Sequence, residues 1–215
     1  MSLLAAMLPA LRGERLAYAK ATVAAYRQHA RQAIANWSRY QPSAWLRQFV
    51  LRLPPSGRVL DYGCGIGMDA AWMRRHGLQV EGIDGTPAFV QEARRRCPGA
   101  PITCALFERV QLPPETYDGV WCQAALIHVP PEVLALQLRK LQEALKPAGC
   151  LALSLAWGRR KAIVMDDWIP GRYIASYSKT EAQRFFRQGW TLRACQVTGA
   201  GSRQGRWIHL LAERA

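Results

Sequence analysis

The sequence predicts an α/β protein whose mostly parallel sheet is covered by helices on both faces. From Val59 onward, apolar runs of strand length alternate with helical segments, which is typical of parallel sheets. The first of these runs ends in a glycine-rich turn that leads directly into a helix. The chain has 215 residues, half of them hydrophobic, which suffices for a single domain with a sizeable core.

The segment before the sheet is expected to form two helices. Residues 14–37 are rich in Ala, Arg and Gln, contain neither Gly nor Pro, and repeat apolar side chains at three- and four-residue steps. Ser43 is placed to cap a second helix over residues 44–53. We therefore divide the single domain into an N-terminal helical cap (1–55) and a core (56–215).

The core is expected to contain short strands separated by helices and turns. Strands are predicted over 58–62, 79–84, 101–106, 117–123, 150–157, 191–198 and 206–213. Helices are predicted from residue 68 and over 87–97, 130–145 and 179–188, with Thr86 and Ser178 as N-caps. The link between the third and fourth strands is too short for a full crossover helix. The stretch 158–177, with mixed charge and several aromatic residues, is expected to be irregular.

The glycine-rich turn indicates what kind of ligand the chain binds. Asp61-Tyr62-Gly63-Cys64-Gly65-Ile66-Gly67 has the pattern D-x-G-x-G-x-G, in which the glycines let the backbone bend and leave room for a ligand. A dinucleotide-binding turn would need G-x-G-x-x-G, and the last position falls on Met68 or Ala70 instead. An acidic group at the strand end suits a ligand that carries an ammonium or sulfonium group.

This turn resembles motif I of the class I S-adenosylmethionine (SAM) methyltransferases. Residues 117–130 (YDGVWCQAALIHVP), the turn 145–149 (LKPAG) and Arg206-Trp207 look like a bacterial small-molecule subgroup, similar to the ubiquinone/menaquinone-type and tellurite-resistance-type enzymes. The resemblance implies a seven-stranded, mostly parallel, doubly wound sheet whose last strand lies antiparallel beside the sixth. It also implies methyl transfer from SAM to an O, N, S or C atom of a small molecule, with S-adenosylhomocysteine (SAH) as product.

The candidate cofactor-binding residues follow the strands, because ligands of open α/β sheets lie beyond the carboxyl ends of the strands. The resemblance implies that Asp84 accepts the ribose hydroxyls, that Phe107 packs on the adenine, and that Ala124 and Ala125 allow close approach of the methionine part. Glu108 is either an adenine contact or a surface residue, and Asp69 either faces the SAM amine or caps its helix. The full candidate set is Asp61, Gly63, Cys64, Gly65, Asp84, Gly85, Leu106, Phe107, Gln123 and Ala124.

The candidate catalytic residues are His128 and Tyr26, and these two together with Tyr173 are expected to position or deprotonate the methyl acceptor. A histidine with its ordinary pKa, near 6.5, suits a general base, although it equally suits a helix cap or a bond to a backbone carbonyl. The sulfonium is already activated, so a base is needed only where the acceptor atom carries a proton. The first helix and residues 158–177 are expected to form an acceptor lid. Its expected aromatic lining is Tyr26, Trp157, Trp168 and Tyr173.

The net charge of +14 invites a nucleic-acid function. The arginines are spread along the chain with no run of five basic residues and no base-stacking module, so we expect no specific nucleic-acid partner. An RNA methyltransferase is the alternative function, and a non-catalytic SAM-binding partner protein is a second. Against the second, the turn keeps Asp61 and its glycines, and Asp84 is present.

Other patterns bear on metals and location. The six cysteines are scattered without a C-x-x-C pair, so no metal site and reduced thiols are expected. No apolar run approaches the roughly 18 residues of a membrane-spanning helix, so no membrane partner is expected. The apolar opening, residues 1–11, lacks a basic region ahead of it, which favours a cytoplasmic protein. A monomer or homodimer is expected.

Overall fold

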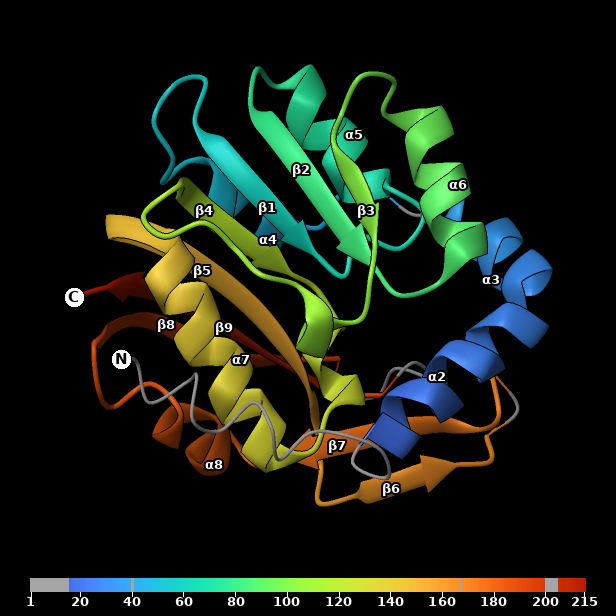
Figure 1. Cartoon of the computed structure of the whole chain (residues 1–215). Helices are drawn as coiled ribbons and strands as arrows, with labels where there is room; N and C mark the ends of the chain where they lie inside the picture. Colours follow the sequence, from blue (N-terminus) through green and yellow to red (C-terminus); the bar gives the residue numbers. More distant parts are fainter. Residues whose placement is uncertain (1–15, 40, 167, 200–204) are drawn as a thin grey trace.

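A twisted sheet forms the centre of the molecule (Figure 1). The computed structural model describes residues 16–39, 41–166, 168–199 and 205–215. The expectation for residues 1–11 therefore lies outside it, as does most of 199–205, which the sequence predicts to be a glycine-rich loop. The described strands form one nine-stranded sheet. They are β1 (Arg58–Tyr62), β2 (Gln79–Asp84), β3 (Ile102–Cys104), β4 (Tyr117–Cys122), β5 (Leu145–Trp157), β6 (Lys161–Val164), β7 (Arg172–Tyr177), β8 (Trp190–Thr198) and β9 (Trp207–Arg214).

Helices cover the sheet and its carboxyl edge. They are α2 (Ala17–Gln28), α3 (Ala30–Trp37), α4 (Ala44–Val50), α5 (Met68–Arg75), α6 (Pro87–Arg96), α7 (Pro131–Ala144) and α8 (Lys179–Arg184), with short 3-10 turns η3 (Phe107–Arg109) and η4 (Leu126–His128). One cluster of buried apolar side chains includes Leu134 and Leu141 of α7, and a second includes Phe49 of α4 and Met73 of α5. The sheet is therefore packed on both faces, as predicted.

The strand order confirms the predicted parallel core. Strands β3-β2-β1-β4-β5 lie side by side, and each neighbouring pair is parallel. Strand β9 then pairs antiparallel with both β5 and β8. The antiparallel last strand that the resemblance implied is therefore present. The order reverses between β1 and β4, and this switch point is where ligands of open α/β sheets bind.

The stretch 158–177 is not irregular, and this prediction was wrong. It contains an antiparallel hairpin in which β6 pairs with β7, and β7 also pairs in parallel with the end of β5. The hairpin adds two strands to the expected seven. Its signal is weak because Lys161, Ala162 and Ile163 of β6 are all exposed, so no alternation of apolar and polar residues marks the strand.

Other predicted boundaries moved. The third strand ends at Cys104 instead of residue 106, and the first helix is interrupted at His29. Ser43 and Ser178 cap their helices as predicted, since their side chains accept the N–H groups of Leu46 and Glu181. Thr86 precedes α6, but its side chain makes no capping hydrogen bond. In the described part of the chain, no helix has the length and apolar character needed to cross a membrane.

Candidate functional site

The glycine turn after β1 has the tight geometry that the motif predicts. Gly63, Gly65 and Gly67 all have positive φ angles, of 88°, 52° and 77°, a backbone conformation that residues with a side chain rarely adopt. A methyl group on Gly63 would overlap the side chain of Ala125, which follows β4. The N–H groups of Gly63 and Cys64 donate to the Ile83 carbonyl oxygen at 2.8 and 2.9 Å. The turn is thus held between β2 and the end of β4.

Asp84 braces this turn at the end of β2. Its Oδ2 accepts the Gly65 N–H at 3.0 Å, and its Oδ1 accepts the Thr86 N–H at 2.8 Å. Burial raises the pKa of the carboxyl, and these two backbone donors oppose that shift. The Asp84 carboxylate therefore lies at the glycine turn, where the resemblance implies a ribose.

Two more acids lie next to the glycines, Asp61 in β1 and Asp69 in the first turn of α5. Asp61 is 2% exposed, and burial together with Asp69 and Asp84 raises its pKa well above the usual range. Burial raises the pKa of Asp69 to about 6, even though the Trp121 indole N–H donates to its Oδ2 at 2.8 Å. One oxygen of each acid, Asp61 Oδ2 and Asp69 Oδ1, is buried without a hydrogen-bond partner. Burial favours the uncharged form of both acids, and a cationic ligand group beside them would favour the carboxylates instead.

The segment after β3 lies beside the turn. The Phe107 ring stacks on Tyr62 with centroids 4.4 Å apart, and a methyl group added to Gly85 would lie 3.2 Å from Leu106 Cδ2. Glu108 accepts a hydrogen bond from the Tyr18 hydroxyl of α2, so it is not a free surface acid. Leu106 and Phe107 therefore border the site, whereas Glu108 fastens the N-terminal cap.

The residues after β4 pack more tightly than expected. Ala124 has a φ of 52°, an uncommon conformation for a residue with a side chain. Ala125 is buried against Gly63, so its small size serves the packing of the turn. Gln123 accepts a hydrogen bond from the Ser154 hydroxyl at 2.6 Å, which directs its amide toward β5.

The two candidate catalytic side chains, 102 residues apart, touch each other. His128 Nδ1 lies 2.8 Å from the Tyr173 carbonyl oxygen, and Nε2 lies 2.9 Å from the Tyr26 hydroxyl. A carbonyl only accepts, so Nδ1 carries the proton and Nε2 accepts the Tyr26 O–H. Burial and the nearby Arg172 lower the pKa of His128 to about 4, while burial raises the pKa of Tyr26. At neutral pH the imidazole is therefore uncharged.

Helix α2 binds three elements around the site through one stripe of side chains. Tyr18, Thr22 and Tyr26 are spaced four residues apart, so they lie on one face of the helix. They bond Glu108 after β3, the Tyr173 N–H of β7 at 3.0 Å, and His128 after β4. The apolar pattern of the first helix did not reveal this polar stripe, because the partners come from distant segments.

The expected aromatic lining is only partly assembled. Tyr173 lies against Tyr18, with ring centroids 5.8 Å apart, and Trp168 packs with Tyr26 in a cluster that joins α2 and α3 to Ile66 of the glycine turn. Trp157 is 42% exposed and is covered by the Arg206 guanidinium, so it lies outside this group.

Residues 59–149 match the family described as a methyltransferase domain. The chain is 33% identical over 111 residues to a SAM-dependent Diels-Alderase of Talaromyces variabilis, covering 48% of this chain and 37% of that protein. It is 36% identical over 105 residues to a ubiquinone biosynthesis O-methyltransferase of Xanthomonas campestris, covering 46% and 43%. The chain thus spans less than half the length of these two relatives.

A solved structure has the same fold over nearly the whole chain. It is the Burkholderia thailandensis 1,6-didemethyltoxoflavin-N1-methyltransferase with bound 1,6-didemethyltoxoflavin and SAH. The TM-score is 0.72 at 18% identity, covering 92% of this chain and 89% of that one. At this identity the likeness concerns the fold.

Proposed function

We propose that this chain, which belongs to the class I SAM-dependent methyltransferases, transfers a methyl group from SAM to a small-molecule acceptor and releases SAH. The observation that carries the proposal is the pair of unpartnered buried oxygens, Asp61 Oδ2 and Asp69 Oδ1, next to the glycine turn. A cationic ligand group close to these acids would offset the cost of burying their charge, and SAM carries an ammonium and a sulfonium group.

The cofactor would be held by the residues that border the carboxyl edge. Asp84 uses one lone pair of each oxygen on backbone N–H groups, which leaves acceptor capacity for ribose hydroxyls. Leu106 and Phe107 would flank the adenine beside Gly85. The remaining candidates shape the backbone of the site: Gly63, Cys64 and Gly65 in the turn, and Gln123 and Ala124 after β4.

SAM supplies an activated methyl group, so this chain has to bind the acceptor, orient it and manage its proton. The uncharged His128 Nε2 accepts a hydrogen bond from the Tyr26 hydroxyl in this structure. The O–H or N–H of a methyl acceptor in place of that hydroxyl would hydrogen-bond to Nε2 and pass its proton there as the new bond to the methyl carbon forms, and Tyr26 would orient the acceptor. With a pKa lowered to about 4, His128 is a weak base. It therefore suits acidic acceptors such as phenols and enols.

Helix α2 and the hairpin β6–β7 would enclose the acceptor. They are fastened to each other by the bond between Thr22 and the Tyr173 N–H. The cluster that contains Ala25, Ala33 and Ile169 shields this side from water. Exclusion of water strengthens the polar contacts in the site. Release of the bond between Tyr26 and His128 would admit the acceptor.

The test is SAH production. Purified full-length chain is incubated with SAM and a panel of phenolic, enolic and heteroaromatic acceptors, and SAH is quantified by mass spectrometry. We expect SAH to form only when an acceptor is present, together with a product heavier by one methyl group. SAM binding with no SAH from any acceptor would favour a non-catalytic SAM-binding protein, or chemistry like that named for the Diels-Alderase relative.

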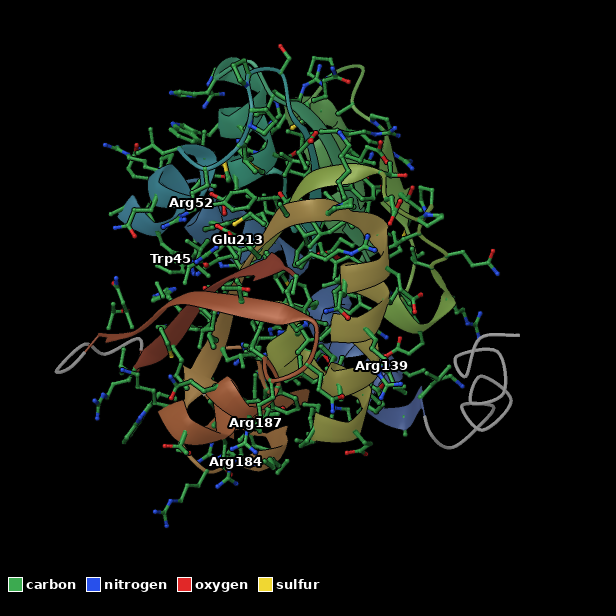
Figure 2. The ribbon with its side chains drawn as sticks, turned by 90° about the vertical axis from the view of Figure 1, so that its left-hand side faces the viewer. Trp45, Arg52, Arg139, Arg184, Arg187 and Glu213 are labelled. Carbon is green, nitrogen blue, oxygen red and sulfur yellow. The ribbon has the colours of Figure 1, made fainter. Side chains whose placement is uncertain are left out.

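The charged surface supports RNA methylation less well. Figure 2 labels Arg139, Arg184 and Arg187 on the α7–α8 side, and their side chains make no hydrogen bond or ion pair to the residues that the structure describes. Free arginines attract the RNA backbone without reading its sequence, so weak, salt-sensitive RNA binding is expected. Filter binding at several salt concentrations tests this.

A monomer or homodimer in the cytoplasm stays a prediction. Sedimentation tests the oligomeric state, and cell fractionation tests the location.

A further inference from the structure

We propose that a surface groove between the start of α4 and the outer side of α5 binds a small anion attached to a flat aromatic group. The groove has a volume of about 220 Å³. Its lining consists of Gln41, Pro42, Arg47, Met68, Trp72 and Arg75. None of these residues belongs to the candidate catalytic pair or to the candidate cofactor set, so the proposal does not depend on methyl transfer.

The charge of the groove is unbalanced. Arg47 and Arg75 both line it, and no acidic residue does. Within the described residues, neither guanidinium makes a hydrogen bond or an ion pair, whereas Arg95 is paired with Glu92. Two like charges that share a small groove repel each other, and a bound anion would reverse that penalty. Planar guanidinium groups bind carboxylates and phosphates through two parallel hydrogen bonds.

The wall of the groove suits an aromatic ring. Met68, Trp72 and Arg75 are spaced by four and three residues along α5, so their side chains share one face of the helix. The His76 ring stacks on Trp72 with centroids 3.8 Å apart and an interplanar angle of 28°, which holds the indole in place. Pro42 adds further apolar surface to the lining. An aryl carboxylate or aryl phosphate fits this combination of flat apolar walls and two cations.

A larger groove at the amino ends of β1 and β2 lacks unpaired arginines among the described residues. Its volume is about 530 Å³, and it is lined by Arg58, Arg74 and Glu81 among others. Arg58 is ion-paired with Glu81, and Arg74 donates to the Pro98 carbonyl oxygen at 3.3 Å. Its cations already have partners, so size alone does not indicate an anion site.

The test is calorimetric titration of the full chain with phenyl phosphate, benzoate, inorganic phosphate and neutral benzamide. We expect saturable binding of phenyl phosphate and benzoate, with affinity at least about tenfold higher than for inorganic phosphate, and no binding of benzamide. The double variant Arg47→Gln/Arg75→Gln should lose this binding. The matched control Arg139→Gln/Arg184→Gln removes the same charge from the α7–α8 side (Figure 2) and should keep it.

Two further measurements make the outcome decisive. Cooperative urea unfolding of each variant shows that the chain is folded, independently of ligand binding in the groove. The variant Trp72→Ala should weaken the aryl anions but leave the weak binding of inorganic phosphate unchanged. Absence of saturable binding to wild type, or equal loss in both double variants, would overturn the proposal, because the first denies a site and the second indicates general charge attraction.

Discussion

The glycine turn and the α2 side of the site contribute to one candidate centre but are built differently. The turn is a contiguous segment, residues 61–67, whose conformation is fixed by backbone geometry and by close contact with Ala125. The α2 side instead joins Tyr26, His128 and Tyr173, which are brought together only by the folded chain. A change in the turn should therefore affect stability and cofactor binding, whereas a change on the α2 side should affect the acceptor and the proton.

The largest effect is expected for Gly63→Ala. The added methyl group overlaps Ala125, and φ at this position is 88°, so overpacking and backbone strain add together. We expect a loss of about 3–5 kcal/mol in unfolding free energy, measured by urea denaturation. Gly77→Ala is the control, since φ there is 86° but nothing lies within 4 Å of the added carbon. Equal losses would show that close contact in the turn is unimportant.

The second effect concerns the α2 side. His128→Gln should lower kcat about 100-fold, at the low end for a lost general base, and leave SAH affinity unchanged. Tyr18→Phe is the control, because it breaks the bond to Glu108 at the far end of the same stripe of α2 and should change kcat far less. If the two variants lowered kcat equally, His128 would only position the cap.

The third effect returns to the turn. Asp84→Ala should weaken SAH binding by about 1.5–3 kcal/mol, the range for hydrogen bonds to a charged group. Asp118→Ala is the control, because that acid is bound to Lys146 at the opposite end of the strands. An unchanged dissociation constant for Asp84→Ala in calorimetry would mean that the ribose is held elsewhere.

The smallest effect is a difference in pH dependence between the two regions. Asp69 has a pKa raised to about 6, so it binds a proton more readily in the folded chain, and its contribution to stability falls as the pH rises from about 4 to 6. His128 has a pKa lowered to about 4, so its contribution rises between about pH 4 and 6.5.

Variants at these two positions separate the contributions. Between about pH 4 and 6.5, Asp69→Asn should make the unfolding free energy rise more steeply with pH, and His128→Gln should make it rise less steeply. Accumulated over this range, each difference from wild type should reach about 1–3 kcal/mol. Urea denaturation at pH 4, 5, 6 and 7 measures both slopes. The same slope in wild type and in both variants would show that neither group has the shifted pKa described above.

The same contrast explains what the sequence could predict. The strand, turn and acids around Gly63 and Asp84 were predictable because their signals are local. The turn needs positive φ angles, and these positions are occupied by glycines at a regular spacing in the sequence. The hairpin of β6 and β7 was not, because β6 shows no apolar alternation. The polar stripe that begins at Tyr18 was also missed, since its partners lie in distant segments and only tertiary packing brings them together.

Calorimetric titration of the folded wild-type chain with SAH tests the central claim most directly. The buried acids next to the turn and the carboxylate of Asp84 predict saturable binding of one SAH per chain. SAM should compete for the same site, and Asp84→Ala should weaken both ligands. A chain that unfolds cooperatively in urea, and is therefore folded, but binds neither SAM nor SAH would contradict the account.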